Sequence, residues 1–218
     1  MRNIGFFLLG LSLIVSACSD PINDQTVEVI DPMQMKIDAL PVEPLSEGEV
    51  NALTFIREEE KLARDVYDWF YTQWSLQAFD NISNSEQKHM NAVGFLVERY
   101  NLIDPVGDKA PGIFENPVLQ DLYQSLTTQG EVSLNEALMV GLSIEEMDIR
   151  DIQNELDNTV DNQDITMVFD NLLRGSRNHL RSYASKLESQ GGTYTPQYIT
   201  QEEYDLIINS EMEKGDGN

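Results

Sequence analysis

Cysteine and histidine are nearly absent from this chain of 218 residues, which contains one cysteine and two histidines. A single cysteine excludes internal disulfide bonds and any Cys-x-x-Cys metal centre. Basic residues are also scarce, with 14 Lys and Arg against 38 Asp and Glu and a net charge of −24. Such a surface repels phosphate backbones, so the sequence argues against nucleic acid as a partner and favours cations. We expect most of these carboxylates to form a solvated surface.

The only cysteine ends a hydrophobic N-terminal segment, "MRNIGFFLLGLSLIVSAC". Its apolar stretch, from Ile4 to Val15, is too short for a permanent membrane span but suits a signal peptide. "VSAC" resembles the lipobox of bacterial lipoproteins, in which the cysteine becomes the lipidated N-terminus. A single buried thiol would not explain the apolar stretch before it. The sequence therefore predicts a signal peptide over residues 1–17, a lipid on Cys18, and anchoring in the bacterial cell envelope, at the outer membrane if the cell is Gram-negative.

The rest of the chain divides by composition. Residues 19–44 are acidic and contain several prolines, which predicts a flexible tether. Residues 45–210 read as one folded domain, and residues 211–218 as a disordered tail. No β-alternation is present, so the predicted fold class is all-α.

Four long stretches of the folded part have helical periodicity, and their starts are marked. Ser46 with Glu49, and Ser133 with Glu136, have the spacing of capping boxes. Asp80 and either Asp161 or Asn162 are plausible caps for the other two stretches. Shorter helices are predicted at 117–126, within the connection between the second and third long helices, and at 200–211. That connection, about 101–132, is long enough to run back along a helix, which predicts the one-crossover topology of ferritin-like four-helix bundles.

The inward face of each long helix is apolar at its ends and polar in its middle. Residues spaced three and four apart define these faces, and they are Leu53, Ile56, Glu60, Ala63, Tyr67, Phe70 and Trp74; Phe79, Ile82, Glu86, His89, Val93, Leu96 and Tyr100; Leu134, Leu138, Gly141, Glu145, Asp148 and Ile152; and Ile165, Phe169, Leu172, Ser176, His179 and Tyr183. Both histidines and four carboxylates are therefore expected inside the domain, at one level.

Four buried carboxylates would cost several kcal/mol each if nothing neutralised them, by the order of magnitude known for buried ions. Two divalent cations would cancel the charge. Carboxylates with a few imidazoles on facing helices suit non-haem iron or manganese, and zinc is also allowed. The alternative is a buried network of ion pairs, for which Arg64, Arg174 and Arg177 are near enough in sequence.

Four segments carry a resemblance to a known group of proteins: "FIREEEKLARDVY", "SEQKHMNAV", "IEEMDIRDIQ" and "LLRGSRNHL". Together they resemble an uncharacterised bacterial and archaeal ferritin-like family, distantly related to erythrins and rubrerythrins, over about residues 45–210. The resemblance implies a dinuclear iron or iron/manganese site. Its implied ligands are Glu60, Glu86, His89, Glu145, Asp148 and His179, with Glu86 and Glu145 bridging the two metals. Ser176 stands where the family pattern has a glutamate, which weakens the expectation of a second metal.

The resemblance also implies an activity, reduction of peroxide or dioxygen. Because no cysteine centre is available for electron transfer, turnover would require an external reductant protein. The alternatives are a lipoprotein that binds or buffers metal without turnover, and a structural bundle with a degenerate site. Tyr67, Tyr100 and Tyr183 lie on the same helix faces as the predicted ligands, where they either hydrogen-bond to them or simply pack in the core. The sequence leaves a homodimer open. We expect Glu59 and Glu146, which fall off the inward faces, to face solvent or at most to contact the ligands from outside.

Overall fold

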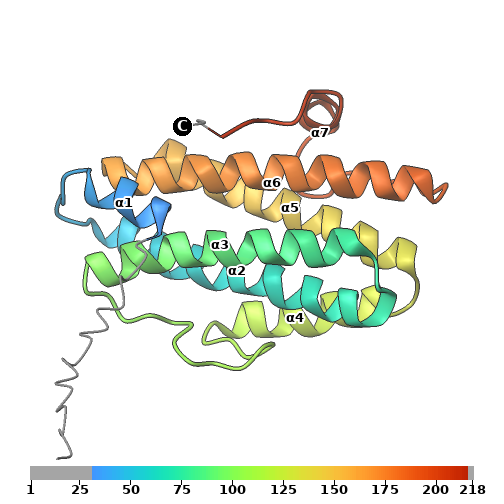
Figure 1. Cartoon of the computed structure of the whole chain (residues 1–218), viewed down its shortest axis with the longest axis horizontal. Helices are drawn as coiled ribbons and strands as arrows, with labels where there is room; N and C mark the ends of the chain where they lie inside the picture. The colour runs from blue at the N-terminus through green and yellow to red at the C-terminus, as the bar shows by residue number, and fades with distance from the viewer. Residues whose placement is uncertain (1–30, 216–218) are drawn as a thin grey trace, which may run out of the picture. The chain divides into compact units, whose positions relative to one another are not determined.

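The computed structural model describes residues 31–215 as seven helices, and this part of the chain contains no strand. The helices are α1 (Pro32–Asp38), α2 (Glu47–Trp74), α3 (Gln77–Arg99), α4 (Pro117–Gly130), α5 (Leu134–Asn158), α6 (Gln163–Ser189) and α7 (Gln201–Ile208) (Figure 1). None of the helices in this range is long and apolar enough to cross a membrane. The predicted signal peptide and Cys18 lie outside the described residues.

Four long helices, α2, α3, α5 and α6, lie side by side around a shared core (Figure 1). Helix α2 turns directly into α3 because Ser75, which caps α2, has a left-handed backbone with φ 50°. The four predicted inward faces are confirmed, since nearly all of their residues are buried. Trp74, His89, Tyr100 and Leu134 are only partly buried.

The predicted helix starts are confirmed in part. Ser46 and Glu49 form a reciprocal capping box, and Ser133 accepts a hydrogen bond from the amide of Glu136. In contrast, α3 begins at Gln77, before Asp80, and has no side-chain cap. Asn162 occupies the cap position of α6 without making a side-chain hydrogen bond there.

The long connection between α3 and α5 runs back along α2 and carries α4 (Figure 1). Buried polar side chains of α2 hold it in place. Glu58 accepts hydrogen bonds from the amides of Glu115 and Asn116, at 2.5 and 3.0 Å. Lys61, which is fully buried, pairs with Asp65 and donates to the carbonyl of Ala110 at 3.0 Å. The charged sequence of α2 is therefore explained partly by the backbone groups of the crossover, which need hydrogen-bond partners.

Two segments expected to be flexible are ordered. Residues 32–38, predicted as part of the tether, form α1, whose Ile37 is 1% exposed and joins the core. Arg99 of α3 fixes this segment by pairing with Asp38 at 3.0 Å and donating to the carbonyl of Leu40 at 2.6 Å. The tether prediction is thus wrong for this stretch, because an apolar anchor within an acidic segment was overlooked.

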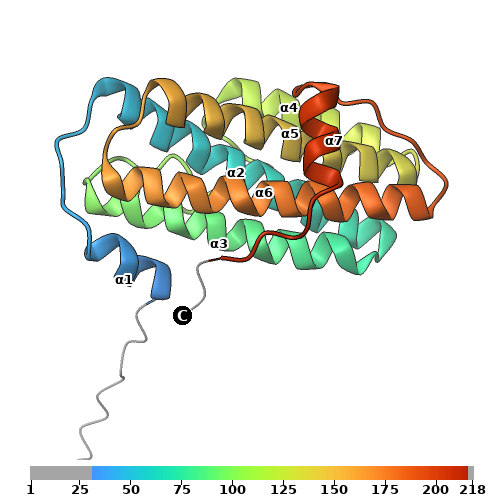
Figure 2. The same cartoon turned by 90° about the horizontal axis from the view of Figure 1, so that it is seen from above.

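The predicted disordered tail is also wrong for residues 211–215. Glu213 pairs with Arg177 and, at 2.8 Å, with Arg181, both on α6. The hydrogen bonds from these guanidinium groups lower the pKa of Glu213 to about 2. Before it, α7 crosses α6, as the view from above shows (Figure 2).

Candidate metal centre

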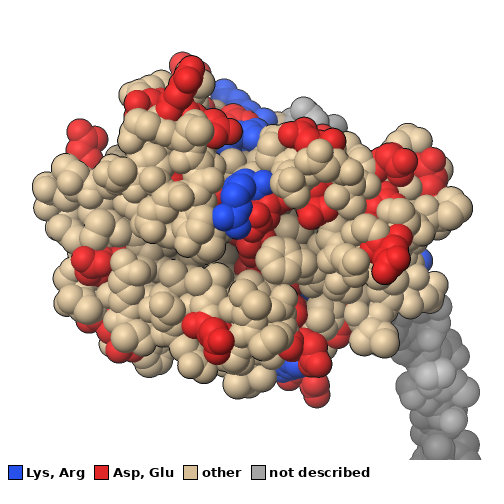
Figure 3. Space-filling model, turned by 180° about the vertical axis from the view of Figure 1, so that it is seen from behind, with Lys and Arg blue, Asp and Glu red and all other residues tan. Residues whose placement is uncertain are grey.

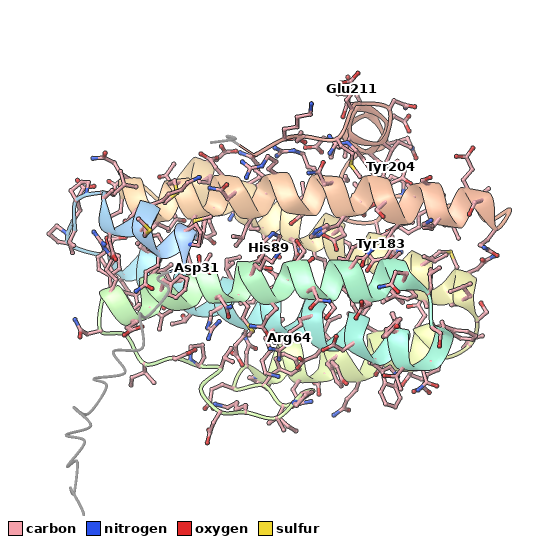
Figure 4. The ribbon with its side chains drawn as sticks, in the orientation of Figure 1. Asp31, Arg64, His89, Tyr183, Tyr204 and Glu211 are labelled. Atoms are coloured by element: carbon pink, nitrogen blue, oxygen red, sulfur yellow. The ribbon has the colours of Figure 1, made fainter. Side chains whose placement is uncertain are left out.

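Five ionisable side chains meet in the middle of the four long helices. Glu60 comes from α2, Glu86 and His89 from α3, Glu145 from α5 and His179 from α6. The three carboxylate residues are at most 1% exposed, and the histidine side chains are 13% and 10% exposed. His89 points from α3 towards α6 (Figure 4). The structure thus brings together five of the six predicted ligands.

These residues form two groups that share Glu86. Glu60, Glu86 and His89 make the first group, and Glu86, Glu145 and His179 make the second. One oxygen of Glu86 lies 2.6 Å from Nδ1 of His89, and its other oxygen lies 2.7 Å from Nδ1 of His179. Glu60 Oε2 is 3.3 Å from the first nitrogen, and Glu145 Oε2 is 3.4 Å from the second. Glu86 alone is common to both groups, whereas the family resemblance implied that Glu145 also bridges.

The atoms that face one another lie within ion-pair distance but make no hydrogen bond of normal geometry. Both oxygens of Glu86, one oxygen each of Glu60 and Glu145, and Nδ1 of both histidines are buried without a hydrogen-bond partner. Unpaired buried polar atoms are rare and costly in native proteins. Their convergence on two shared positions is the arrangement that a cation at each position would satisfy.

Other side chains hold the outer sides of these groups. The hydroxyl of Tyr67 donates to Glu145 Oε1 at 2.6 Å, and Ser85 Oγ lies 3.0 Å from Nε2 of His179. With Nε2 engaged by Ser85, Nδ1 of His179 is directed at the carboxylates. The ring of Tyr183 packs against Tyr67, with 5.3 Å between ring centroids, and its hydroxyl has no hydrogen-bond partner among residues 31–215.

The ionisation of the cluster follows from burial and mutual attraction. Burial raises the pKa of Glu60 and of Glu145 to about 7, against the opposing effects of His89 and His179 respectively. Burial lowers the pKa of each histidine, but the neighbouring carboxylates outweigh it; they hold the pKa of His89 well above its usual value and raise that of His179 to about 10. The pKa of Glu86 falls far below its usual value because the two imidazolium groups outweigh its burial. Glu86 is therefore the permanent anion of the cluster.

These pKa values predict that metal binding releases protons. At pH 7 both histidines are protonated, and Glu60 and Glu145 are about half protonated. Loading of both positions should therefore release roughly three protons per chain at pH 7, and affinity should rise from about pH 6 to about pH 10, where His179 has lost its proton. An indicator dye in weakly buffered solution measures this release. Metal binding without proton release would contradict the assignment of these ligands.

Gly175 makes room for one of the histidines. A Cβ atom at this position of α6 would lie 2.4 Å from Cε1 and 2.5 Å from Nε2 of His89, closer than real Cβ contacts come. The sequence offered a signal in this glycine, which interrupts a strongly helical pattern, but its role was not recognised before the structure showed it.

The Gly175→Ala substitution should displace the His89 ring and weaken binding at the first group by about 10- to 100-fold, the range typical of perturbed ligand support. The second group should bind metal as before. Calorimetric metal titration measures the affinities of the two groups separately. Gly94→Ala, at a helical glycine whose Cβ would meet Arg57 instead, is the matched control and should leave both affinities unchanged. Equal loss at both groups would contradict this role.

Asp148, the sixth predicted ligand, is in neither group. It is 1% exposed, and neither of its oxygens has a hydrogen-bond partner in the described range. Burial, followed by the repulsion of Glu59 and the other carboxylates, raises its pKa well above the usual value. Asp148 therefore stands beside the cluster as a carboxyl group whose surroundings favour the protonated form.

The expectation that Glu59 and Glu146 face solvent is wrong, and the structure decides between the alternatives left open for Tyr100 and for the arginines. Glu59 is buried and faces Asp148 and Asp151 rather than solvent. Glu146 is fully buried and accepts hydrogen bonds from the amides of Gln197 and Tyr198, at 2.7 and 2.8 Å. The hydroxyl of Tyr100 donates to Asp164 at 2.9 Å, away from the cluster. The arginines proposed to neutralise the cluster contact none of its members, since Arg64 binds Asp65 and Gln87, Arg174 binds Asn171, and Arg177 binds Glu213.

Ser176 lies in α6 where the family pattern would supply a carboxylate. It is 1% exposed, and its hydroxyl donates to the carbonyl of Leu172 at 3.1 Å. The hydroxyl is thus engaged by its own helix. The cluster therefore has the five side chains described above and no ligand from this position.

Comparison with known proteins places the chain among relatives. Residues 49–211 match the family model described as "Uncharacterized protein domain (DUF2202)". The chain is 49% identical over 179 residues to the uncharacterized protein MJ0754 of Methanocaldococcus jannaschii, covering 82% of this chain and 96% of that protein. The crystal structure of the hypothetical protein MJ0754 superposes with a TM-score of 0.78 and covers 80% of this chain and 99% of that one.

Proposed function

This chain belongs to the DUF2202 family, and we propose that it binds two metal ions, two irons or one iron and one manganese, within a ferritin-like four-helix bundle. One observation carries the proposal. The two oxygens of Glu86 face Nδ1 atoms of different histidines at 2.6 and 2.7 Å, and all four atoms lack hydrogen-bond partners. Buried polar atoms need partners, and metal ions accept carboxylate oxygens and imidazole nitrogens as ligands.

The residues divide between the two ions. Glu60 and His89 would hold one ion, Glu145 and His179 the other, and Glu86 would bind both. Oxygen-rich sites with one imidazole per ion suit iron and manganese, and zinc is the next candidate. The excess of carboxylate over basic residues also attracts cations to the protein.

The proposed activity is reduction of peroxide or dioxygen. Two ferrous ions, when bound, supply the two electrons that reduce hydrogen peroxide to water. Around them, Tyr67 fixes Glu145 by its hydrogen bond, and protonated Asp148 holds a proton next to the cluster. The near-complete burial of the carboxylates limits access of water. The electrons for further cycles would come from an external reductant protein, because the chain has a single cysteine.

The proposed location is the bacterial cell envelope, with the chain attached to the membrane by a lipid on Cys18. The sequence "VSAC" after an apolar stretch supports it. Growth of the producing cells with a radiolabelled fatty acid tests this, since label should enter the wild-type protein and not the Cys18→Ser variant. Equal labelling of both would contradict the anchor.

A second candidate is metal binding without turnover. The burial of the ligands and the lack of an electron-transfer centre in the chain favour it. A single experiment separates the two functions. The protein is loaded anaerobically with ferrous iron, freed of excess metal and mixed with one equivalent of hydrogen peroxide. Rapid oxidation of two irons per chain supports the redox function, and slow oxidation at the rate of free iron supports metal holding. If no iron is bound after loading, neither function holds and the domain has a structural role only.

A further inference from the structure

The two histidines differ in what their outer nitrogens contact. Nε2 of His179 lies 3.0 Å from Ser85 Oγ. Nε2 of His89 packs closely against Gly175 of α6. It makes no hydrogen bond with any residue in the range 31–215. Histidines that bind metal through one nitrogen almost always donate the N–H of the other to an acceptor. The acceptor for His89 is therefore missing from the described chain.

His89 lines a cavity of about 450 Å³ between α1, α3 and α6. Three basic side chains line it, Lys36 of α1, Lys88 of α3 and Arg174 of α6. Asn171 lines it as well. The only carboxylate in the lining is that of Asp31, which accepts the amide hydrogen of Met33 as the cap of α1.

The concentration of positive charge is unusual for this chain. Its net charge is −24, and acidic side chains are scattered over the face seen in Figure 3, with few basic ones among them. Eight basic residues of the described range form ion pairs with carboxylates, but Lys36, Lys88 and Arg174 form none there. Three unpaired cations around one cavity repel each other unless an anion joins them.

We infer that this cavity binds a small oxyanion, such as inorganic phosphate or a carboxylate, which accepts the hydrogen bond of His89 Nε2–H and pairs with Lys36, Lys88 and Arg174. When Nδ1 binds a metal ion, the hydrogen of the neutral ring lies on Nε2. The anion would complete the outer contacts of His89 as Ser85 does for His179. Anion binding to the metal-bound protein rests on the proposed function. Anion binding to the metal-free protein does not, because the cavity and its basic side chains are present without metal.

Nuclear magnetic resonance of the metal-free protein tests the site. With only two histidines in the chain, ¹⁵N-labelled histidine gives signals that single substitutions assign. Titration with inorganic phosphate should shift the Nε2 resonance of His89 and leave that of His179 in place. A parallel titration with acetate tells whether a tetrahedral oxyanion or a carboxylate is preferred.

Variants distinguish a specific binding site from non-specific attraction between charges. The Lys36→Gln/Lys88→Gln double variant should weaken phosphate binding on the order of tenfold, as the loss of two close cationic partners implies. The Lys109→Gln/Lys186→Gln variant changes the charge equally at lysines outside the cavity and should bind phosphate as wild type does. No shift of His89 Nε2 up to about 50 mM of either anion, far above the millimolar range of a weak site, would overturn the inference. Equal weakening in both double variants would also overturn it. Because no metal is present, neither result depends on whether the proposed metal site exists.

Discussion

Replacing Glu86 by glutamine should abolish binding of both metal ions, whereas replacing Glu60 or Glu145 by glutamine should abolish one. Glu86 is the only residue common to both groups, and each of its oxygens faces a different histidine. A neutral amide cannot replace a carboxylate that two cations share. We expect affinity at both positions to fall by at least about 100-fold, the upper range for loss of ligand support. Elemental analysis after loading and desalting measures the number of ions retained.

The matched control for this substitution is Glu146→Gln. Glu146 is also a fully buried glutamate, but it binds the amides of Gln197 and Tyr198 rather than the cluster. It should lose stability and keep both metals. Circular dichroism confirms that each variant is folded. Retention of one metal by Glu86→Gln would show that the two groups do not share this ligand.

Removal of metal should strongly destabilise the protein. Without cations, the carboxylates of Glu60, Glu86 and Glu145, together with Asp148, remain buried in one region. A ligand that binds only the folded state at a thousandfold excess over its dissociation constant stabilises it by about 4 kcal/mol. For two sites in a domain of this size, the melting temperature should rise on the order of 20 °C on loading.

Zinc suits this measurement because it has no redox chemistry. Differential scanning calorimetry of wild type with zinc and with a chelator gives the difference directly. Glu86→Gln should show almost no difference between the two conditions. A melting temperature that is insensitive to metal in wild type would contradict the cluster as a folding-linked metal site.

The sequence predicted correctly which polar residues lie in the middle of the inward faces of the four helices, because helical periodicity determines which residues share a face. Glu60, Glu86, Glu145 and His179 fall on regular three- and four-residue spacings and are buried in the structure. The spacing does not reveal distance, so it placed Asp148 in the cluster although the structure leaves it beside both groups.

The errors at Glu59 and Glu146 have a different origin. Periodicity identifies one inward face per helix, but α2 is covered on further sides by α4 and by α5. Glu146 in α5 is covered by residues 197–198, whose amides it binds. Both glutamates are buried by segments that no local pattern connects to them. The position of Tyr100 beside Asp164 is likewise a long-range contact between α3 and the start of α6.

Gly175 and Ser85 have roles that the spacing of residues along a helix cannot predict. Gly175 is needed because α6 passes close to the ring of His89, and Ser85 is needed because its hydroxyl meets His179. Each role depends on the partner helix lying at a particular distance. Sequence predicts the faces of helices, and only the structure gives the distances between them.

X-ray diffraction from crystals of the iron-loaded protein, recorded on both sides of the iron absorption edge, tests the central claim most directly. The account predicts two anomalous peaks per chain, about 3.5–4 Å apart as in dinuclear sites generally. One should lie beside Glu60 and His89, the other beside Glu145 and His179, and both should contact Glu86. No peak between the four long helices, or a single peak that does not involve Glu86, would contradict it.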